Sequence, residues 1–450
     1  MSKSNKFYLN KLAKSKLIYL LVLYILILGI DPVRKIISPS NIFLIAIYIW
    51  TVVVYYITLR KDALTGSVIT GSPLIAIFLL FAWLIFVWVI TSTPNIIAIT
   101  GLQSYLFFVP YFYVGQKVLG NDYNLTIWLK VQSYCGALIG IGAIISEVFR
   151  SSAPKILQPI IPQVANHSAG LGSIYLPSSI FADGEKAAEM LLISLFALIA
   201  YNAKCPRSSL LNGRLLLGLL ILGGIIATST RTDIFLALIA IGMLFLVGKY
   251  NSLKYRIEKS NIRPYLIAMI LIGLFCIVAI ASVSGGSKFY NFLNATNQTS
   301  SRLQLMFFLP SQIPFVGQGP GTSTQGISNT GTQSLPLQGE PTYNYEGHTY
   351  ITGEGAITKV WLEIGIVGLI IYVFLFWTIF SPLILKFKYV DNIGKSFIVG
   401  CICLGILFLK GHASLDDPFI QPLFWLNAGV ATTRMNFCQR GNYKSNIYTP

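Results

Sequence analysis

Charged side chains are scarce in this chain. They make up 11% of its 450 residues, while hydrophobic residues make up 54%; a typical soluble domain is about 25% charged. A soluble domain could not cover so much apolar surface, so the composition excludes an ordinary soluble protein. Apolar runs long enough to cross a bilayer, roughly 17–25 residues each, recur along most of the chain. The sequence therefore predicts a polytopic membrane protein.

Acidic side chains are the scarcer of the two charged kinds. The chain has 16 Asp and Glu against 33 Lys and Arg, a formal net charge of +17, which by itself could indicate a nucleic-acid partner. With the N-terminus in the cytoplasm, however, about two thirds of the basic residues fall in inner segments, as the positive-inside rule expects. We therefore attribute the excess charge to membrane topology. Both termini are expected in the cytoplasm, and no nucleic-acid partner is expected.

Cysteine and histidine are also rare, with 6 and 3 residues. No cysteine falls in a predicted outer loop, so the outer segments have no disulfide framework. The only adjacent acidic pair in an outer loop, Asp416 and Asp417, precedes Pro418 and is expected to end a hairpin rather than to bind a metal. No metal or other cofactor is expected.

The apolar runs predict an all-α membrane protein of about twelve transmembrane helices, with a large outer loop between the ninth and the tenth. The predicted spans cover residues 17–30, 41–59, 73–93, 95–115, 125–146, 187–203, 213–229, 233–248, 264–283, 356–380, 396–411 and 417–433. Residues 1–283 hold the first nine spans and an outer loop at 147–186, residues 284–355 form the large loop, and residues 356–450 hold the last three spans and a short inner tail. Within the large loop we expect a short amphipathic helix at 299–308 and an irregular path over the membrane surface at 317–345.

Four short motifs follow one another on the predicted outer side. Arg231 lies in a Thr-Ser-Thr-Arg-Thr segment at the outer end of a span, and a glycine-rich turn at 314–321 follows a segment that bears Arg302. His348 lies near the end of the large loop, and a Glu-x-Gly-x-x-Gly pattern begins at Glu363 in the next span. Together these motifs resemble those of the O-antigen ligase and O-antigen polymerase family of lipid-linked glycan transferases, over residues 165–380.

This resemblance implies that a glycan is transferred from a polyprenyl diphosphate carrier to an acceptor hydroxyl, at the periplasmic face of a bacterial inner membrane. The acceptor is another carrier-linked repeat in a polymerase and a terminal membrane-anchored saccharide in a ligase, and the sequence leaves both open. The implied partners are the donor, the saccharide acceptor, the lipid bilayer, and a chain-length regulator or flippase of the same pathway.

Arg231 and Arg302 are the candidate ligands of the donor diphosphate. A guanidinium group binds phosphate oxygens bidentately and can stabilise the charge that develops as a diphosphate departs. Simpler interpretations are a local pair of Arg231 with Asp233 and an interfacial position for Arg302 at a helix start. An activated donor makes ATP unnecessary, and the turn at 317–321 lacks the Gly-Lys-Ser/Thr ending of a phosphate-binding P-loop.

His348, Glu354 and Glu363 are the candidate catalytic residues. A histidine near the acceptor hydroxyl can act as a general base, because histidine titrates near the working pH. Either glutamate could orient the histidine or bind the acceptor sugar. The simpler alternatives are a solvated loop histidine, a favourable helix-start position for Glu354, and a surface pair of Glu363 with Lys359 one turn earlier.

Two other classes of protein stay open. A transporter, such as a lipid-linked oligosaccharide flippase or an anion carrier, fits the expected number of spans. Ionisable residues within spans mark transport pathways, and the predicted spans contain almost none apart from Lys130. The third class is a structural membrane partner of a polysaccharide assembly complex.

Overall fold

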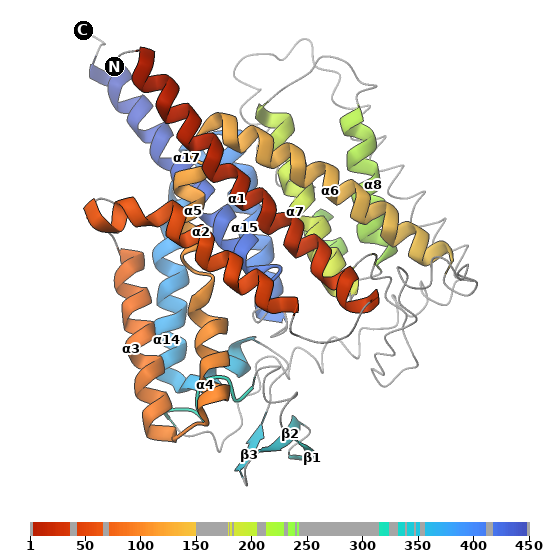
Figure 1. Ribbon diagram of the computed structural model, residues 1–450, viewed down its shortest axis with the longest axis vertical. Coiled ribbons are helices and arrows are strands. Elements are labelled where there is room, and N and C mark those ends of the chain that lie inside the picture. Colours follow the sequence, from red (N-terminus) through yellow and green to blue (C-terminus); the bar gives the residue numbers. More distant parts are fainter. Residues whose placement is uncertain are drawn as a thin grey trace.

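The computed structural model describes residues 3–36, 43–65, 72–149, 179, 181, 184–204, 213–228, 233–238, 241–242, 315–323, 332–337, 340–345, 348–351, 356–410 and 417–447. This part of the chain is mostly helical (Figure 1). It contains 6 helices or helical segments long and apolar enough to cross a membrane, and three shorter apolar helices. The prediction of a helical membrane protein is therefore confirmed in this general form. The predicted span 264–283 and most of 233–248 lie outside the described residues.

Most helices agree closely with the predicted spans. The uninterrupted ones are α1 (Lys3–Ile36), α2 (Leu44–Thr65), α3 (Ser72–Thr91), α6 (Asp122–Val148), α7 (Gly184–Lys204), α8 (Gly213–Ala227), α15 (Asn392–Lys410) and α17 (Gln421–Ile447). The helix α14 (Ala356–Leu385) is kinked. The largest differences are in the first and last helices: α1 begins at Lys3, whereas the predicted span begins at residue 17, and α17 continues to Ile447 through the segment expected to be a short tail.

The surface of the bundle is apolar where lipid would contact it. Helix α3 is apolar all round, and Phe78 and Val89 are 67% and 70% exposed; near the end of α14, Leu385 is 77% exposed. Contiguous exposed apolar surface of this kind is not stable in water. It is expected of helices that face hydrocarbon, which supports a position in the bilayer for α3 and α14.

Small residues allow α6 to lie close to its neighbours. A Cβ atom at Gly136 would lie 2.2 Å from the Cβ atom of Ser194 in α7, and one at Gly140 would lie 2.2 Å from the carbonyl oxygen of Leu220 in α8. Small residues one helical turn apart let membrane helices pack backbone against backbone. The sequence therefore fixes a tight α6–α7–α8 unit.

Ion pairs show which helix ends meet at one end of the bundle. Asp122, the first residue of α6, pairs with Lys204, the last residue of α7 (2.6 Å), and with Arg434 of α17 (2.8 Å). Arg434 also pairs with Asp391, which precedes α15. The start of α6, the end of α7 and the start of α15 thus lie together, as an alternating up-and-down topology requires.

The opposite end holds a small sheet that the sequence analysis did not foresee. Strands β1 (Thr332–Leu337), β2 (Glu340–Tyr345) and β3 (His348–Ile351) form an antiparallel sheet in the order β1-β2-β3. The expectation of an irregular path over 317–345 is wrong at β1 and β2. Both chain termini lie at the end of the bundle far from this sheet (Figure 1).

The predicted span at 95–115 is broken. It consists of α4 (Asn95–Leu102), a π-helical segment η2 (Gln103–Phe107) and α5 (Tyr111–Val118), with Pro110 directly before α5. Proline interrupts helical hydrogen bonding. Broken helices persist at membrane depth where protein surrounds the freed backbone. This broken span lies beside the kinked helix α14, and the candidate site is built between them.

Candidate functional site

Helix α14 is broken at Gly365, the first glycine of the Glu-x-Gly-x-x-Gly motif. Gly365 has φ 69° and ψ −177°, a backbone conformation outside the helical region. A break of this kind takes helical donors away from the carbonyl groups before it. Three donors from elsewhere in the chain satisfy those carbonyls: the Gln318 amide bonds the Leu362 carbonyl (2.7 Å), the Gly319 amide bonds the Glu363 carbonyl (2.9 Å), and the Trp83 indole bonds the Ile364 carbonyl (2.8 Å). The glycine-rich loop thus completes the broken helix.

The side chain of Glu363 binds the same loop. Its Oε2 atom accepts a hydrogen bond from the backbone amide of Gly321 (3.1 Å), and its Oε1 atom accepts one from that of Ser323 (2.9 Å). The side chains of Glu363 and Lys359 are both 0% exposed. The alternative of a surface pair between these two residues is therefore wrong.

The loop at 315–323 can take this path only because it contains glycine. Gly317, Gly319 and Gly321 have φ values of 89°, 117° and 86°, in the region that side-chain-bearing residues rarely adopt. A Cβ atom at Gly319 would lie 1.8 Å from the Oγ1 atom of Thr93, and one at Gly321 would lie 2.0 Å from the carbonyl oxygen of Ile97. The loop is packed between the α3–α4 turn, α4 and α14, with no room for a side chain at Gly319 or Gly321.

This arrangement determines whether the backbone amides of the loop can bind an anion. Backbone amides that converge in a turn commonly bind phosphate or another anion. Here the amides of Gly321 and Ser323 already bind a carboxylate from the chain itself. The carboxylate of Glu363 therefore already occupies these two amides; it is buried and holds the loop through backbone contacts.

Lys359 joins the two broken spans. Its Nζ atom lies 5.6 Å from the centre of the Tyr105 ring, within cation–π range, and Tyr105 belongs to the π-helical segment η2. Tyr105 also packs edge-on against Tyr372 of α14, with ring centres 5.6 Å apart. Neither Lys359 nor Tyr105 was among the predicted site residues; the sequence signal for Lys359 is a lysine inside a span.

His348 is the first residue of β3, and its side chain is exposed. It lies opposite Tyr345 in the sheet, and its ring centre lies 6.2 Å from that of Tyr350. Tyr350 is 7% exposed and packs against Ile97 of α4, whose carbonyl group borders Gly321 on the loop. The first turn of α4 thus contacts both the strand that carries His348 and the loop that Glu363 holds.

Three of the candidate residues, Arg231, Arg302 and Glu354, lie outside the described residues. So does the predicted amphipathic helix at 299–308. The nearest described residues on either side of Arg231 are buried: Thr228 is 0% exposed and Asp233 is 1% exposed. The predicted roles of these three residues stay predictions.

Asp417 occupies the turn before α17. Its Oδ1 atom accepts the backbone amide of Phe419 (2.7 Å), and its Oδ2 atom lies 3.2 Å from Nζ of Lys186, near the start of α7. Burial raises the pKa of the Asp417 carboxyl above its ordinary value, and the Lys186 ammonium opposes this rise. This agrees with the expected turn-forming role. In the described part of the chain, no three His, Cys, Asp or Glu side chains group as metal ligands would.

Ionisable side chains are more frequent inside the helices than the sequence analysis expected. Asp31 of α1, Glu189 of α7, and Lys359 and Glu363 of α14 lie within candidate spans and are at most 4% exposed. The expectation that the spans contain almost no such residues is therefore wrong. Asp31 lies one residue beyond the predicted span 17–30, whereas Glu189, Lys359 and Glu363 lie within the predicted spans 187–203 and 356–380.

A scan against protein-family models finds no model that matches this chain, and a search of curated proteins finds no match to it. The resemblance to the O-antigen ligase and polymerase family therefore depends on the four motifs and on how the described ones are arranged.

Proposed function

We propose that this protein transfers a glycan from a polyprenyl diphosphate carrier to a hydroxyl of a saccharide acceptor, at the periplasmic face of the membrane. The observation that carries the proposal is the pair of hydrogen bonds from Gly321 and Ser323 to Glu363. These bonds join the glycine-rich loop to the Glu-x-Gly-x-x-Gly motif, 40 or more residues later in the chain, in one buried assembly. The strand β3, which begins with the third motif residue His348, contacts Ile97 in the first turn of α4, and the carbonyl group of Ile97 borders Gly321 of the loop.

In this proposal Arg231 and Arg302 hold the donor diphosphate. The acceptor oxygen attacks the anomeric carbon, and the bond from that carbon to the diphosphate oxygen breaks. The proton of the acceptor hydroxyl passes to His348, and polyprenyl diphosphate leaves with the bonding electron pair. Guanidinium groups can stabilise the developing diphosphate charge. Glu363 acts through the loop that it holds, and Glu354 is retained as a candidate to orient His348.

The proposed topology has about twelve spans, with both termini in the cytoplasm and the sheet outside. The termini and the sheet lie at opposite ends of the bundle, which supports it (Figure 1). The proposal includes both a polymerase and a ligase. A flippase or a chain-length regulator of the same pathway is the proposed protein partner.

Transport of a lipid-linked glycan is the second candidate, because ionisable side chains such as Asp31 and Glu189 are buried within spans. Transfer is preferred because the carboxylate of Glu363, in the motif at the break of α14, accepts hydrogen bonds from backbone amides and braces a loop. A transport pathway would instead require ionisable groups that the substrate or a coupling ion can reach.

One experiment separates the two functions. Purified protein in detergent micelles is given a fluorescent lipid-diphosphate glycan donor and a saccharide acceptor. A transferase forms the longer glycan and releases polyprenyl diphosphate in micelles, where no second leaflet exists. Donor that is unchanged in micelles but crosses the bilayer of proteoliposomes would identify a transporter and overturn the proposal.

A further inference from the structure

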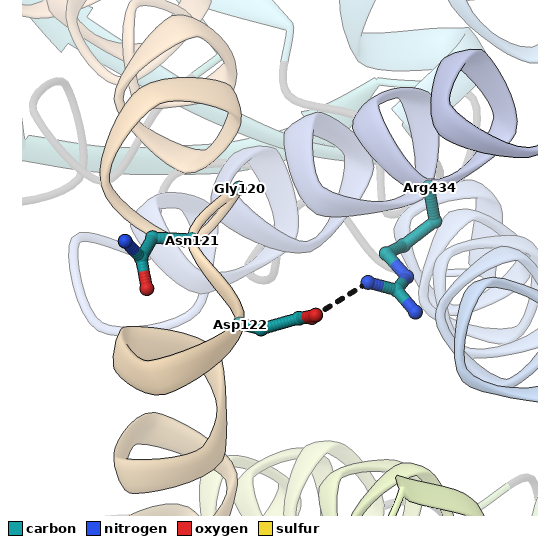
Figure 2. A pocket seen from close by; sticks show the side chains of 4 residues that line it. All are labelled: Gly120, Asn121, Asp122 and Arg434. Carbon is teal, nitrogen blue, oxygen red and sulfur yellow. Dashed lines mark hydrogen bonds and ion pairs between the residues drawn. The ribbon is translucent and has the colours of Figure 1, made fainter. Parts of the chain in front are cut away.

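A small cavity opens at the end of the bundle opposite the sheet. It has a volume of about 320 Å³ and is lined by Gly120, Asn121, Asp122 and Arg434 (Figure 2). This volume is at the lower end of the range for cavities that hold small ligands, about 300–1,000 Å³. The cavity lies far from the glycine loop, so the proposed transfer reaction gives it no role.

On the acidic side of this cavity, only one of the two carboxylate oxygens of Asp122 accepts hydrogen bonds from the described part of the chain. The Oδ1 atom of Asp122 accepts both Lys204 Nζ (2.6 Å) and Arg434 Nη1 (2.8 Å). Its Oδ2 atom accepts no hydrogen bond from the described part of the chain, and the side chain is 71% exposed. Asp122 therefore offers one carboxylate oxygen to a ligand that can donate hydrogen bonds.

The basic side of the cavity has spare donors. Arg434 donates through Nε and Nη2 to Asp391 Oδ2 and through Nη1 to Asp122 Oδ1. A guanidinium group has five N–H donors, so two remain after these three bonds. Asn121 adds little, because its Oδ1 atom accepts the backbone amide of Tyr123 at the start of α6. Figure 2 shows the Arg434 guanidinium group directed toward the Asp122 carboxylate.

The charges of this cluster balance. Asp122 and Asp391 supply two negative charges, and Lys204 and Arg434 supply two positive charges. A simple anion would meet the free oxygen of Asp122, and a simple cation would meet the guanidinium group. A ligand with an ammonium and a phosphate close together is complementary to both.

The position of the cavity indicates where such a ligand comes from. Asp122 begins the candidate span of α6, Lys204 ends that of α7, and Asp391 precedes the apolar helix α15. Residues at the ends of spans lie at the depth of lipid headgroups. A headgroup can therefore enter this cavity while its acyl chains stay beside the helices.

We propose that the cavity between Asp122 and Arg434 binds the headgroup of a zwitterionic phospholipid with a primary ammonium, of the phosphatidylethanolamine type. The ammonium donates to the free oxygen of Asp122, and the phosphate accepts the spare N–H groups of Arg434. The bound lipid fills the junction of α6, α7, α15 and α17. This inference does not depend on the proposed transfer reaction.

Native mass spectrometry of the full-length protein in detergent tests the proposal. Phosphatidylethanolamine, phosphatidylcholine and phosphatidylglycerol with identical acyl chains are titrated separately. Choline keeps the phosphate and the positive charge but has no N–H donors, so we expect phosphatidylethanolamine to bind about tenfold more tightly, equivalent to about 1.4 kcal/mol. Phosphatidylglycerol, which has no ammonium, should bind no better than phosphatidylcholine.

The variant Asp122→Asn should remove this preference, while Asp417→Asn, which removes an ion pair at the other end of the bundle, should keep it. Binding of phosphatidylethanolamine and phosphatidylcholine within about twofold of each other in the wild type would overturn the proposal. That comparison needs no variant and holds even if Asp122→Asn fails to fold. Retention of the preference in a folded Asp122→Asn protein would contradict the assigned site. Free phosphoethanolamine that competes fully at the concentrations used for lipid would show that the ligand is soluble, against the proposal.

Discussion

The carboxylate of Glu363 accepts a hydrogen bond from the backbone amide of Ser323, 40 residues earlier in the chain, at 2.9 Å. With the second bond from Gly321, it fixes the end of the glycine-rich loop to the break in α14. The loop in turn supplies amides to two carbonyl groups that the break exposes. Loop and helix break therefore stabilise each other.

Replacement of Glu363 by glutamine should weaken this assembly. Glutamine has the same shape, but its amide nitrogen cannot accept a hydrogen bond, so one buried loop amide loses its partner. Such a loss costs about 1–3 kcal/mol. Thermal unfolding in detergent should show a lower midpoint, and glycan formation should fall with it. Glu185→Gln, the same change in a half-buried residue at the start of α7, is the control and should lower both less than Glu363→Gln does; equal midpoints for the two variants would contradict the bracing role.

The glycine loop should not tolerate a side chain at position 319. In Gly319→Ala the new methyl group would overlap the hydroxyl of Thr93, and the backbone would be strained at φ 117°. We expect loss of glycan formation and reduced yield of folded protein. Gly405→Ala is the matched control, because nothing lies within 4 Å of that position in α15 and alanine favours a helix by about 0.5–1 kcal/mol. A fully active Gly319→Ala variant would show that the loop is not packed as described.

Lysine at the two candidate arginines tests the diphosphate assignment. Arg231→Lys and Arg302→Lys keep the charge but lose the bidentate fork. Each should lose most of its transfer activity while expression and membrane insertion stay normal. A double variant that makes glycan chains of normal length would mean that both arginines only anchor helices at the interface.

The proposed topology can be tested with single cysteines. Thr349→Cys, at an exposed position in β3, and Ser334→Cys in β1 should react with a membrane-impermeant maleimide in intact spheroplasts. The native Cys438 should react only after permeabilisation. Labelling of the two strand positions only after permeabilisation would place the sheet inside the cell and exclude the proposed reaction.

The helices were predictable because each depends on one local property of the sequence, the length of an apolar run. A run of apolar residues long enough to cross a bilayer predicts a span wherever it occurs, and the ends of α6 and α7 agree with the predicted spans within about four residues, the usual uncertainty of boundaries. The strands were missed because β1 and β2 are short, contain Pro336 and Pro341, and have few apolar residues. Proline and polar residues favour loops in a local interpretation.

The site was only partly predictable. The motif at Glu363 and the turn at 314–321 were identified separately, and the structure brings them together. The burial of Glu363 could not be read from sequence, because the nearby Lys359 makes a surface pair an equally good local explanation. The break at Gly365 depends on donors from Gln318 and Trp83, which are distant in sequence. Contacts of this kind leave no periodic signal.

The measurement that tests the proposed function most directly is the rate of glycan transfer by purified protein in EDTA, followed from pH 5 to pH 9 for the wild type and for His348→Ala. Arginine can neutralise the leaving diphosphate in place of a metal ion, so the wild type should remain active in EDTA. Its rate should fall on the acid side, where a protonated general base can no longer accept the proton of the acceptor hydroxyl. His348→Ala should lose that acid limb and be slower by about 10²- to 10⁴-fold, the usual contribution of a general base. If EDTA abolishes turnover, magnesium or manganese restores it, and His348→Ala is nearly as fast as the wild type, then metal-bound carboxylates carry the chemistry and the proposed mechanism is wrong.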